Sequence, residues 1–77
     1  MIKPDVRSTK GDWRGAVVVC REHGWGVGTR LVGDEGYGPT EIVITAIGNQ
    51  TLLARAIPNG TESPWTLSCR DWREVQP

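Results

Sequence analysis

The sequence predicts an all-β fold in one small domain. Ten Gly and five Pro make up about a fifth of the 77 residues, well above the roughly 12% of an average protein. These residues divide the chain into short segments. Three of the longest uninterrupted ones are of strand length and rich in Val, Ile and Thr: Ala16–His23, Thr40–Ile47 and Asn49–Ile57. Only Trp65–Gln76 is long enough for a helix, and it begins with alternating apolar and polar residues.

The N-terminal part predicts an arm and then a first strand. Residues 1–14 are polar and charged, which is typical of a loose N-terminal arm. Arg14–Arg21 contains the apolar run Ala16–Cys20, which predicts a strand that is covered on both faces or crosses the core. The sequence leaves open whether residues 1–28 add this strand to the sheet or form an arm that contacts a partner. Thr29–Val32 predicts the next short strand.

A hairpin is the clearest element of the chain. Glu41–Ile47 alternates, with one face formed by Ile42, Ile44 and Ala46 and the other by Val43, Thr45 and Ile47. Gly48-Asn49 predicts a two-residue turn. The returning strand is Thr51–Ile57, and we expect its inward face to consist of Leu52, Ala54 and Ala56.

The C-terminal part predicts a second turn and two short strands. Asn59-Gly60 is the residue pair typical of a type I′ turn. Trp65–Cys69 alternates and predicts a strand. Ser68 and Asp71 resemble a weak capping box, which predicts one helical or 3₁₀ turn over Cys69–Trp72. Trp72–Val75 then predicts a short closing strand.

The order of elements from residue 29 onward is similar to an SH3-like small β-barrel, including its KOW and Tudor variants. The resemblance implies about five to six strands, with one short helical or 3₁₀ turn before the last. It is carried by Thr29–Val32, Val43–Gly48, Leu52–Arg55, Trp65–Leu67 and Arg70–Trp72. The Tyr-rich first-strand motif of true SH3 domains is absent from the sequence, so recognition of PxxP peptides is not expected. The same segments, with seven Arg to two Lys, also resemble short proteins of actinobacterial phages and prophages.

Composition excludes several classes of protein. The longest apolar run is five residues, too short for a membrane span or a signal peptide, so we expect a cytoplasmic protein without a membrane partner. Cys20 and Cys69 are expected to be free, buried thiols, because the cytosol is reducing. Cys20 and His23 have the spacing of metal ligands, but a structural zinc site needs four ligands, so no metal or cofactor is expected.

Catalytic residues are sparse. His23 is the single histidine and lies in a Gly-rich segment, where an exposed loop residue is the simplest interpretation. Gly24, Gly26 and Gly28 lack the Gly-Lys-Ser/Thr ending of a phosphate-binding loop, so we interpret them as turn glycines. The sequence therefore predicts no enzyme and no small-molecule substrate.

The aromatic residues are the main candidates for a binding site. Trp65 and Trp72 are expected in the core. Trp25 and Tyr37 lie in Gly-rich loops, where exposed aromatic side chains are natural anchors for a partner. The alternative for Trp25 is that it folds back and caps an open end of the barrel. Trp13 adds a further aromatic residue near the first strand.

Charge is balanced overall but unevenly distributed. Residues 1–30 contain six basic and three acidic side chains, whereas residues 31–62 contain one basic and four acidic ones. The basic section, with Arg14, Arg21, Trp13 and Trp25, has the composition to contact nucleic acid by phosphate neutralisation and stacking. The same asymmetry also suits pairing of the two halves, or head-to-tail self-association.

The leading hypothesis is a non-enzymatic module that binds a protein partner, or forms a homo-oligomer, through loop aromatics or a sheet edge. In a phage this would be an accessory or host-interaction protein. The alternatives are a nucleic-acid-binding barrel that uses the basic N-terminal section, and an accessory subunit that is stable only in a larger assembly.

Overall fold

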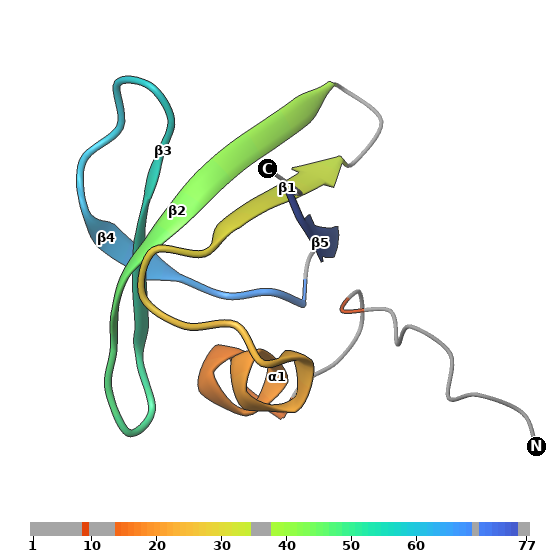
Figure 1. The fold of residues 1–77 in the computed structure, drawn as a ribbon, viewed down its shortest axis with the longest axis vertical. Coiled ribbons are helices and arrows are strands. Elements are labelled where there is room, and N and C mark those ends of the chain that lie inside the picture. The colour runs from red at the N-terminus through yellow and green to blue at the C-terminus, as the bar shows by residue number, and fades with distance from the viewer. Residues whose placement is uncertain (1–8, 10–13, 35–37, 69, 76–77) are drawn as a thin grey trace, which may run out of the picture.

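Five antiparallel strands form one sheet, and a single short helix lies beside it (Figure 1). The structure is a computed structural model, and it describes residues 9, 14–34, 38–68 and 70–75. The elements are α1 (Ala16–His23), β1 (Arg30–Asp34), β2 (Pro39–Ile47), β3 (Leu52–Ala56), β4 (Ser63–Trp65) and β5 (Asp71–Glu74). The prediction of a mostly β domain is confirmed.

The strand order in the sheet is β4-β3-β2-β1-β5, so the last strand lies beside the first. Among the described residues no ladder joins β4 to β5, and the sheet is therefore open. The strands predicted around residues 29–32, 41–47, 51–57 and 72–75 correspond to β1, β2, β3 and β5.

A bulge in β2 changes which residues face the core. Ile44 pairs with Ala54, but the next pair along the ladder is Ala46 with Leu53, so one extra residue lies between them. An inserted residue shifts the alternation by one position, and every side chain beyond it changes face. Ile47 therefore packs against the core. The prediction that Ala46 shares the face of Ile44, with Ile47 on the opposite face, is wrong.

The two predicted turns have different outcomes. The β2–β3 hairpin is confirmed, but its connection has four residues, closed by a hydrogen bond from Gly48 N–H to Thr51 O (2.9 Å). The prediction of a type I′ turn at Asn59-Gly60 is wrong, because neither residue has the positive φ that this turn requires. A Cβ on Gly60 would lie 2.7 Å from the backbone nitrogen of Ala56, so this glycine is needed for a close backbone approach.

The largest correction concerns Ala16–His23, which is a helix and not a strand. Four residues of the helix are buried, and three of them, Ala16, Val19 and Cys20, have the i, i+3, i+4 spacing of one helix face. The helix ends at Gly24, which adopts φ +76°, while Trp25 N–H donates to Cys20 O (2.9 Å). This pattern is a Schellman motif. The cap and the buried face together outweigh the strand preference of the three consecutive valines.

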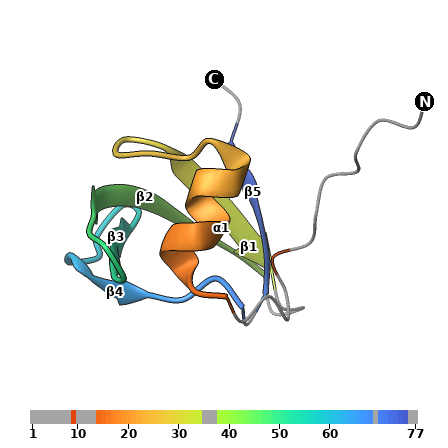
Figure 2. The same cartoon turned by 90° about the horizontal axis from the view of Figure 1, so that it is seen from below.

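The helix covers the open side of the curved sheet, as Figure 2 shows. Its inner face and the inner faces of the strands form one core. The buried members of this core are Ala16, Val19, Cys20, Trp25, Leu31, Ile42, Ile44, Leu52, Ala54, Leu67 and Trp72. The inward positions predicted for Leu52 and Ala54 are confirmed. The helix thus supplies apolar surface that so small a sheet needs to bury its inner face.

The C-terminal segment is extended where a helical turn was predicted. Asp71 and Trp72 belong to β5, so that prediction is wrong at these two residues, and Cys69 lies outside the described residues. The strand predicted over Trp65–Cys69 is shorter, because β4 ends at Trp65. The prediction that Trp65 and Trp72 pack at the core is confirmed, since their rings meet edge to face at 5.8 Å.

Thr9, the one described residue before Arg14, contacts the C-terminal part of the sheet. This residue is 0% exposed, and its hydroxyl is hydrogen-bonded to residues 70 and 72. The expectation of a loose arm over residues 1–14 is therefore wrong at Thr9.

Candidate functional site

Three of the predicted binding residues, Arg14, Arg21 and Trp25, belong to the part of the chain that the structure describes. The backbone of Arg14 precedes α1 and that of Arg21 lies in its last turn, but the Arg14 guanidinium bonds to Glu22, the residue next to Arg21. Both side chains are exposed. Trp13 and Tyr37 lie outside the described residues.

Trp25 is part of the core. Its side chain is 7% exposed, and its ring stacks on that of His23 with 4.3 Å between centroids. The Schellman motif at the end of α1 fixes its backbone, which explains why the indole folds inward. The prediction of an exposed aromatic anchor is wrong for Trp25, and its burial favours the alternative of a cap on the core.

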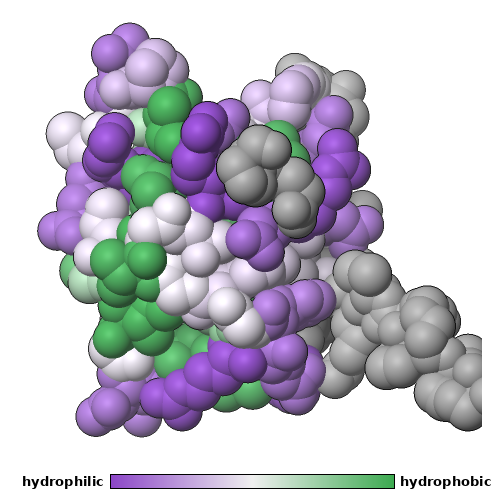
Figure 3. Space-filling model, viewed as in Figure 1, coloured by the Kyte–Doolittle hydropathy of each residue, from purple (hydrophilic) through white to green (hydrophobic). Residues whose placement is uncertain are grey.

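Two residues further on, a tight turn exposes an aliphatic side chain. Thr29 N–H donates to Gly26 O (3.0 Å), Gly28 has φ +92°, and Gly26 N–H donates to the Thr29 hydroxyl (3.0 Å). This geometry is that of a type II turn, which needs glycine at its third position. Val27 is 69% exposed in this turn. Figure 3 shows hydrophobic surface gathered where this α1–β1 loop crosses β2.

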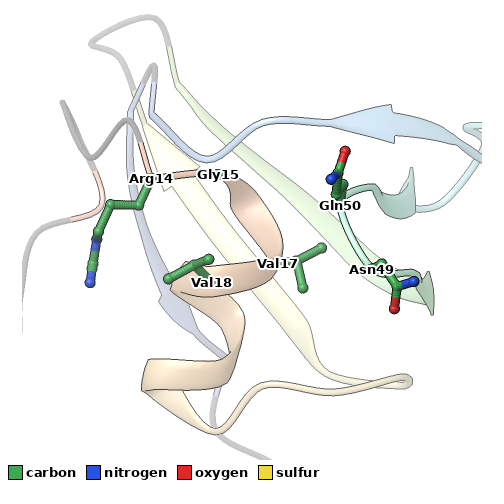
Figure 4. Close-up of a pocket in the computed structure, with 6 residues that line it drawn as sticks. All are labelled: Arg14, Gly15, Val17, Val18, Asn49 and Gln50. Carbon is green, nitrogen blue, oxygen red and sulfur yellow. The ribbon is translucent and has the colours of Figure 1, made fainter.

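A groove lies between the start of α1 and the β2–β3 hairpin (Figure 4). It has a volume of about 330 Å³ and is lined by Arg14, Gly15, Val17, Val18, Asn49 and Gln50. A second hollow of about 270 Å³ shares Gly15 and Gln50 with it and reaches Pro64 and Trp65. The two hollows therefore continue into each other around the first turn of the helix. We call the pair the α1–hairpin groove.

The groove combines an apolar wall with hydrogen-bonding groups. Val18 is 38% exposed and is one of two large aliphatic residues that the described surface leaves open. Figure 4 shows Asn49 and Gln50 across from Val17, with Val18 on the side of the helix toward Arg14. At the helix start, Gly15 makes no side-chain cap bond, and the first intrahelical bond is Val19 N–H to Gly15 O (3.1 Å). The N–H groups before Val19 therefore have no acceptor within the helix.

Charge contributes little inside the groove. The Arg14 guanidinium donates two hydrogen bonds to the Glu22 carboxylate, from Nη1 to Oε2 (2.5 Å) and from Nη2 to Oε1 (3.0 Å). Figure 4 shows Arg14 extending away from the hairpin. Among the described residues, the helix region carries the Arg14–Glu22 ion pair and the exposed Arg21, which together give a weak positive field for contacting a phosphate backbone.

The described residues contain few groups suited to catalysis. Cys20 is a free, fully buried cysteine, and burial raises the pKa of its thiol from 9.0 to about 11. A thiol with so high a pKa is protonated at neutral pH and is a poor nucleophile or metal ligand. Within the described ranges, no three His, Cys, Asp or Glu side chains gather as a metal site.

Sequence reasoning missed the groove residues Val17, Val18, Asn49 and Gln50. The sequence predicts a turn at Gly48-Asn49 and a strand over the valines, and neither prediction indicates a binding site. One sequence signal does indicate a helix over these valines: His23 and Gly24 directly follow the segment that contains them. That pattern is typical of a helix end.

These features define a small β-rich domain with one helix and an open, nearly neutral groove. Residues 14–77 match the family described as "Domain of unknown function (DUF7241)", and the chain belongs to that family. Neither the curated proteins nor the solved structures yield a match. In the part of the chain that the structure describes, no helix has the length and apolarity to span a membrane.

Proposed function

We propose that the protein is a non-enzymatic binding module that holds an extended segment of a partner protein in the α1–hairpin groove. The observation that carries this proposal is that the exposed Val18 and the hydrogen-bonding side chains of Asn49 and Gln50 line one groove. An aliphatic side chain of the partner lies against the exposed Val18, next to Val17, which is itself buried. Its backbone bonds to the amide side chains of Asn49 and Gln50.

The size of the groove supports a peptide over a small molecule. About 330 Å³ is at the low end of ligand pockets, and the groove opens to solvent. Its continuation toward Pro64 and Trp65 extends it in one direction, as an extended chain requires. Trp65 is half-buried, so its ring adds apolar surface at that end.

The sheet edges are poorer candidates for binding than the groove. β4 has only three residues, and Pro64 at its centre has no N–H to donate to an added strand. At the other edge, Thr9 occupies backbone groups of residues 70 and 72. We therefore assign partner binding to the groove in preference to strand addition.

For the fold, we propose an SH3-like barrel that stays open between β4 and β5. Its support is the order of the strands, with β5 beside β1, and the bulge that bends the long β2. With the phage resemblance of its sequence, the proposal assigns the partner to host or virion proteins. The free thiol of Cys20 suits a cytoplasmic location.

The test uses peptides selected from a random library on the immobilised full chain. Selected peptides should carry an aliphatic or aromatic anchor. Val18→Glu should weaken their binding at least tenfold, because a carboxylate replaces the apolar wall. Glu is a good helix former and is favourable in a first turn, so this variant should fold.

Val27→Glu is the matched control, since Val27 is an exposed valine outside the groove and should tolerate the change. If both variants lost peptide affinity equally, or if only Val27→Glu lost it, the binding site would lie outside the groove. Affinity should also change little between about 50 and about 300 mM salt, because the groove is nearly neutral. Binding of a single-stranded oligonucleotide with a log–log salt slope of about −2 to −3 would instead favour the nucleic-acid alternative.

A further inference from the structure

The outer edge of β5 carries a contact that the proposed binding function does not use. β5 pairs with β1 on its inner side, where Val75 N–H donates to Arg30 O (2.8 Å). The direction of backbone hydrogen bonds alternates along an antiparallel strand. Trp72 and Glu74 therefore turn their backbone N–H and C=O groups to the outer side of the sheet.

Thr9 occupies this outer side. Its hydroxyl donates to Arg70 O (2.8 Å) and accepts from Trp72 N–H (2.7 Å). These are the two backbone groups that a neighbouring strand would engage. Thr9 precedes the start of the family match at residue 14, so a residue outside the matched domain covers one of its edges.

The two edges of the sheet differ in how they resist strand addition. β4 is short and carries Pro64, a residue that cannot donate a ladder hydrogen bond. Residues 70–75 contain no proline. The backbone of β5 is therefore competent to pair with another strand once the Thr9 hydroxyl leaves it.

The charges along β5 are self-complementary. The order of residues is Arg70, Asp71, Trp72, Arg73, Glu74. When two copies pair antiparallel about Trp72, Asp71 of each copy faces Arg73 of the other, and Arg70 faces Glu74. Opposite charges directly across two strands stabilise the pairing, whereas like charges disfavour it. The arrangement has the two-fold symmetry of an isologous dimer.

The hydrogen bonds of this pairing coincide with the Thr9 contact. The central pair would join Trp72 N–H of each copy to Trp72 O of the other, and Arg70 O would accept from Glu74 N–H. Thr9 holds one donor and one acceptor of this set. A net charge of zero adds no long-range repulsion between copies.

We propose that the outer edge of β5 is a homodimerisation edge for a second copy of this chain, and that the Thr9 hydroxyl keeps it closed. The central test compares the full chain with Thr9→Val, which retains the shape but loses the hydroxyl. Sedimentation velocity over a concentration series measures dimerisation. The association constant should rise at least tenfold in Thr9→Val, and Thr9→Ser should behave like the unaltered chain.

The charge pattern supplies a second set of variants in the Thr9→Val background. Asp71→Arg places two like-charged pairs across the interface and should lower the association constant about tenfold. Adding Arg73→Asp restores opposite charges and should restore the dimer. A folded Thr9→Val chain that stays monomeric would overturn the proposal, as would a dimer that is insensitive to these charge changes.

Amide exchange of the unaltered chain tests the closed edge even where Thr9→Val does not fold. The Trp72 amide should exchange slowly, because the buried Thr9 hydroxyl accepts its hydrogen bond. Exchange as fast as that of Val27 in its exposed turn would show that the edge is not held by Thr9.

Discussion

Replacement of Trp25 by alanine separates a core role from a binding role. The indole is 7% exposed and belongs to the buried cluster that joins α1 to the sheet. Truncation of a buried tryptophan to alanine costs about 3 to 5 kcal/mol. A domain of 77 residues has a total stability of about 4 to 12 kcal/mol. The substitution therefore removes a large share of the stability of the fold.

Urea unfolding followed by far-UV circular dichroism measures this loss. With an m-value of about 1 kcal/mol per molar urea, the urea midpoint of Trp25→Ala should fall by about 3 to 5 M. Trp25→Phe is the control, and it should lose less because it retains an aromatic ring. A Trp25→Ala chain within about 1 kcal/mol of the unaltered one would refute the core assignment. Such a chain with lost partner binding would restore the anchor role.

Two further predictions follow from buried positions. A Cβ on Gly33 would lie 2.8 Å from the Trp72 ring. Gly33→Ala should therefore destabilise the domain by about 1 to 3 kcal/mol in the same urea assay. The control Gly26→Ala should cost less stability, because a Cβ at Gly26 has open space around it. Because burial raises the pKa of the Cys20 thiol to about 11 in the folded chain, the stabilisation by the protonated thiol is complete below pH 9 and is lost as the pH rises from 9 to 11. The unaltered chain should therefore lose up to about 3 kcal/mol more stability over this range than Cys20→Ala, and equal pH profiles would contradict the burial argument.

The strands of the sheet were predictable because their patterns are local. Leu52 and Ala54 alternate with less buried residues, and the structure buries both. The bulge in β2 was not predictable in this way, because a period of two does not reveal an inserted residue. Only the pairing of Ala46 with Leu53, set by the partner strand, defines it.

The helix was missed because two signals conflict within the same eight residues. Three consecutive valines favour a strand, whereas the spacing of Ala16, Val19 and Cys20 and the cap at Gly24 favour a helix. Packing against the sheet decides the outcome, and that information is not local.

The groove could not be predicted from the sequence for a related reason. Its walls come from Val17 and Val18 at the start of α1 and from Asn49 and Gln50 in the hairpin connection, more than thirty positions later. Only a helix at residues 16–23 brings these two segments together. The aromatic residues suggested a site in the loops, yet Trp25 is buried, and the large hydrophobic residues exposed in the described part of the chain are Val18 and Val27.

The most direct test of partner binding by the α1–hairpin groove is a chemical-shift map of the unaltered chain. A selected peptide is titrated into isotope-labelled protein, and the backbone and side-chain amide signals are followed. The largest changes should fall on Val17, Val18, Asn49 and Gln50, and the signals of β5 should not move. Changes concentrated at Val27 or along β5, with the groove signals unmoved, would contradict binding in the groove.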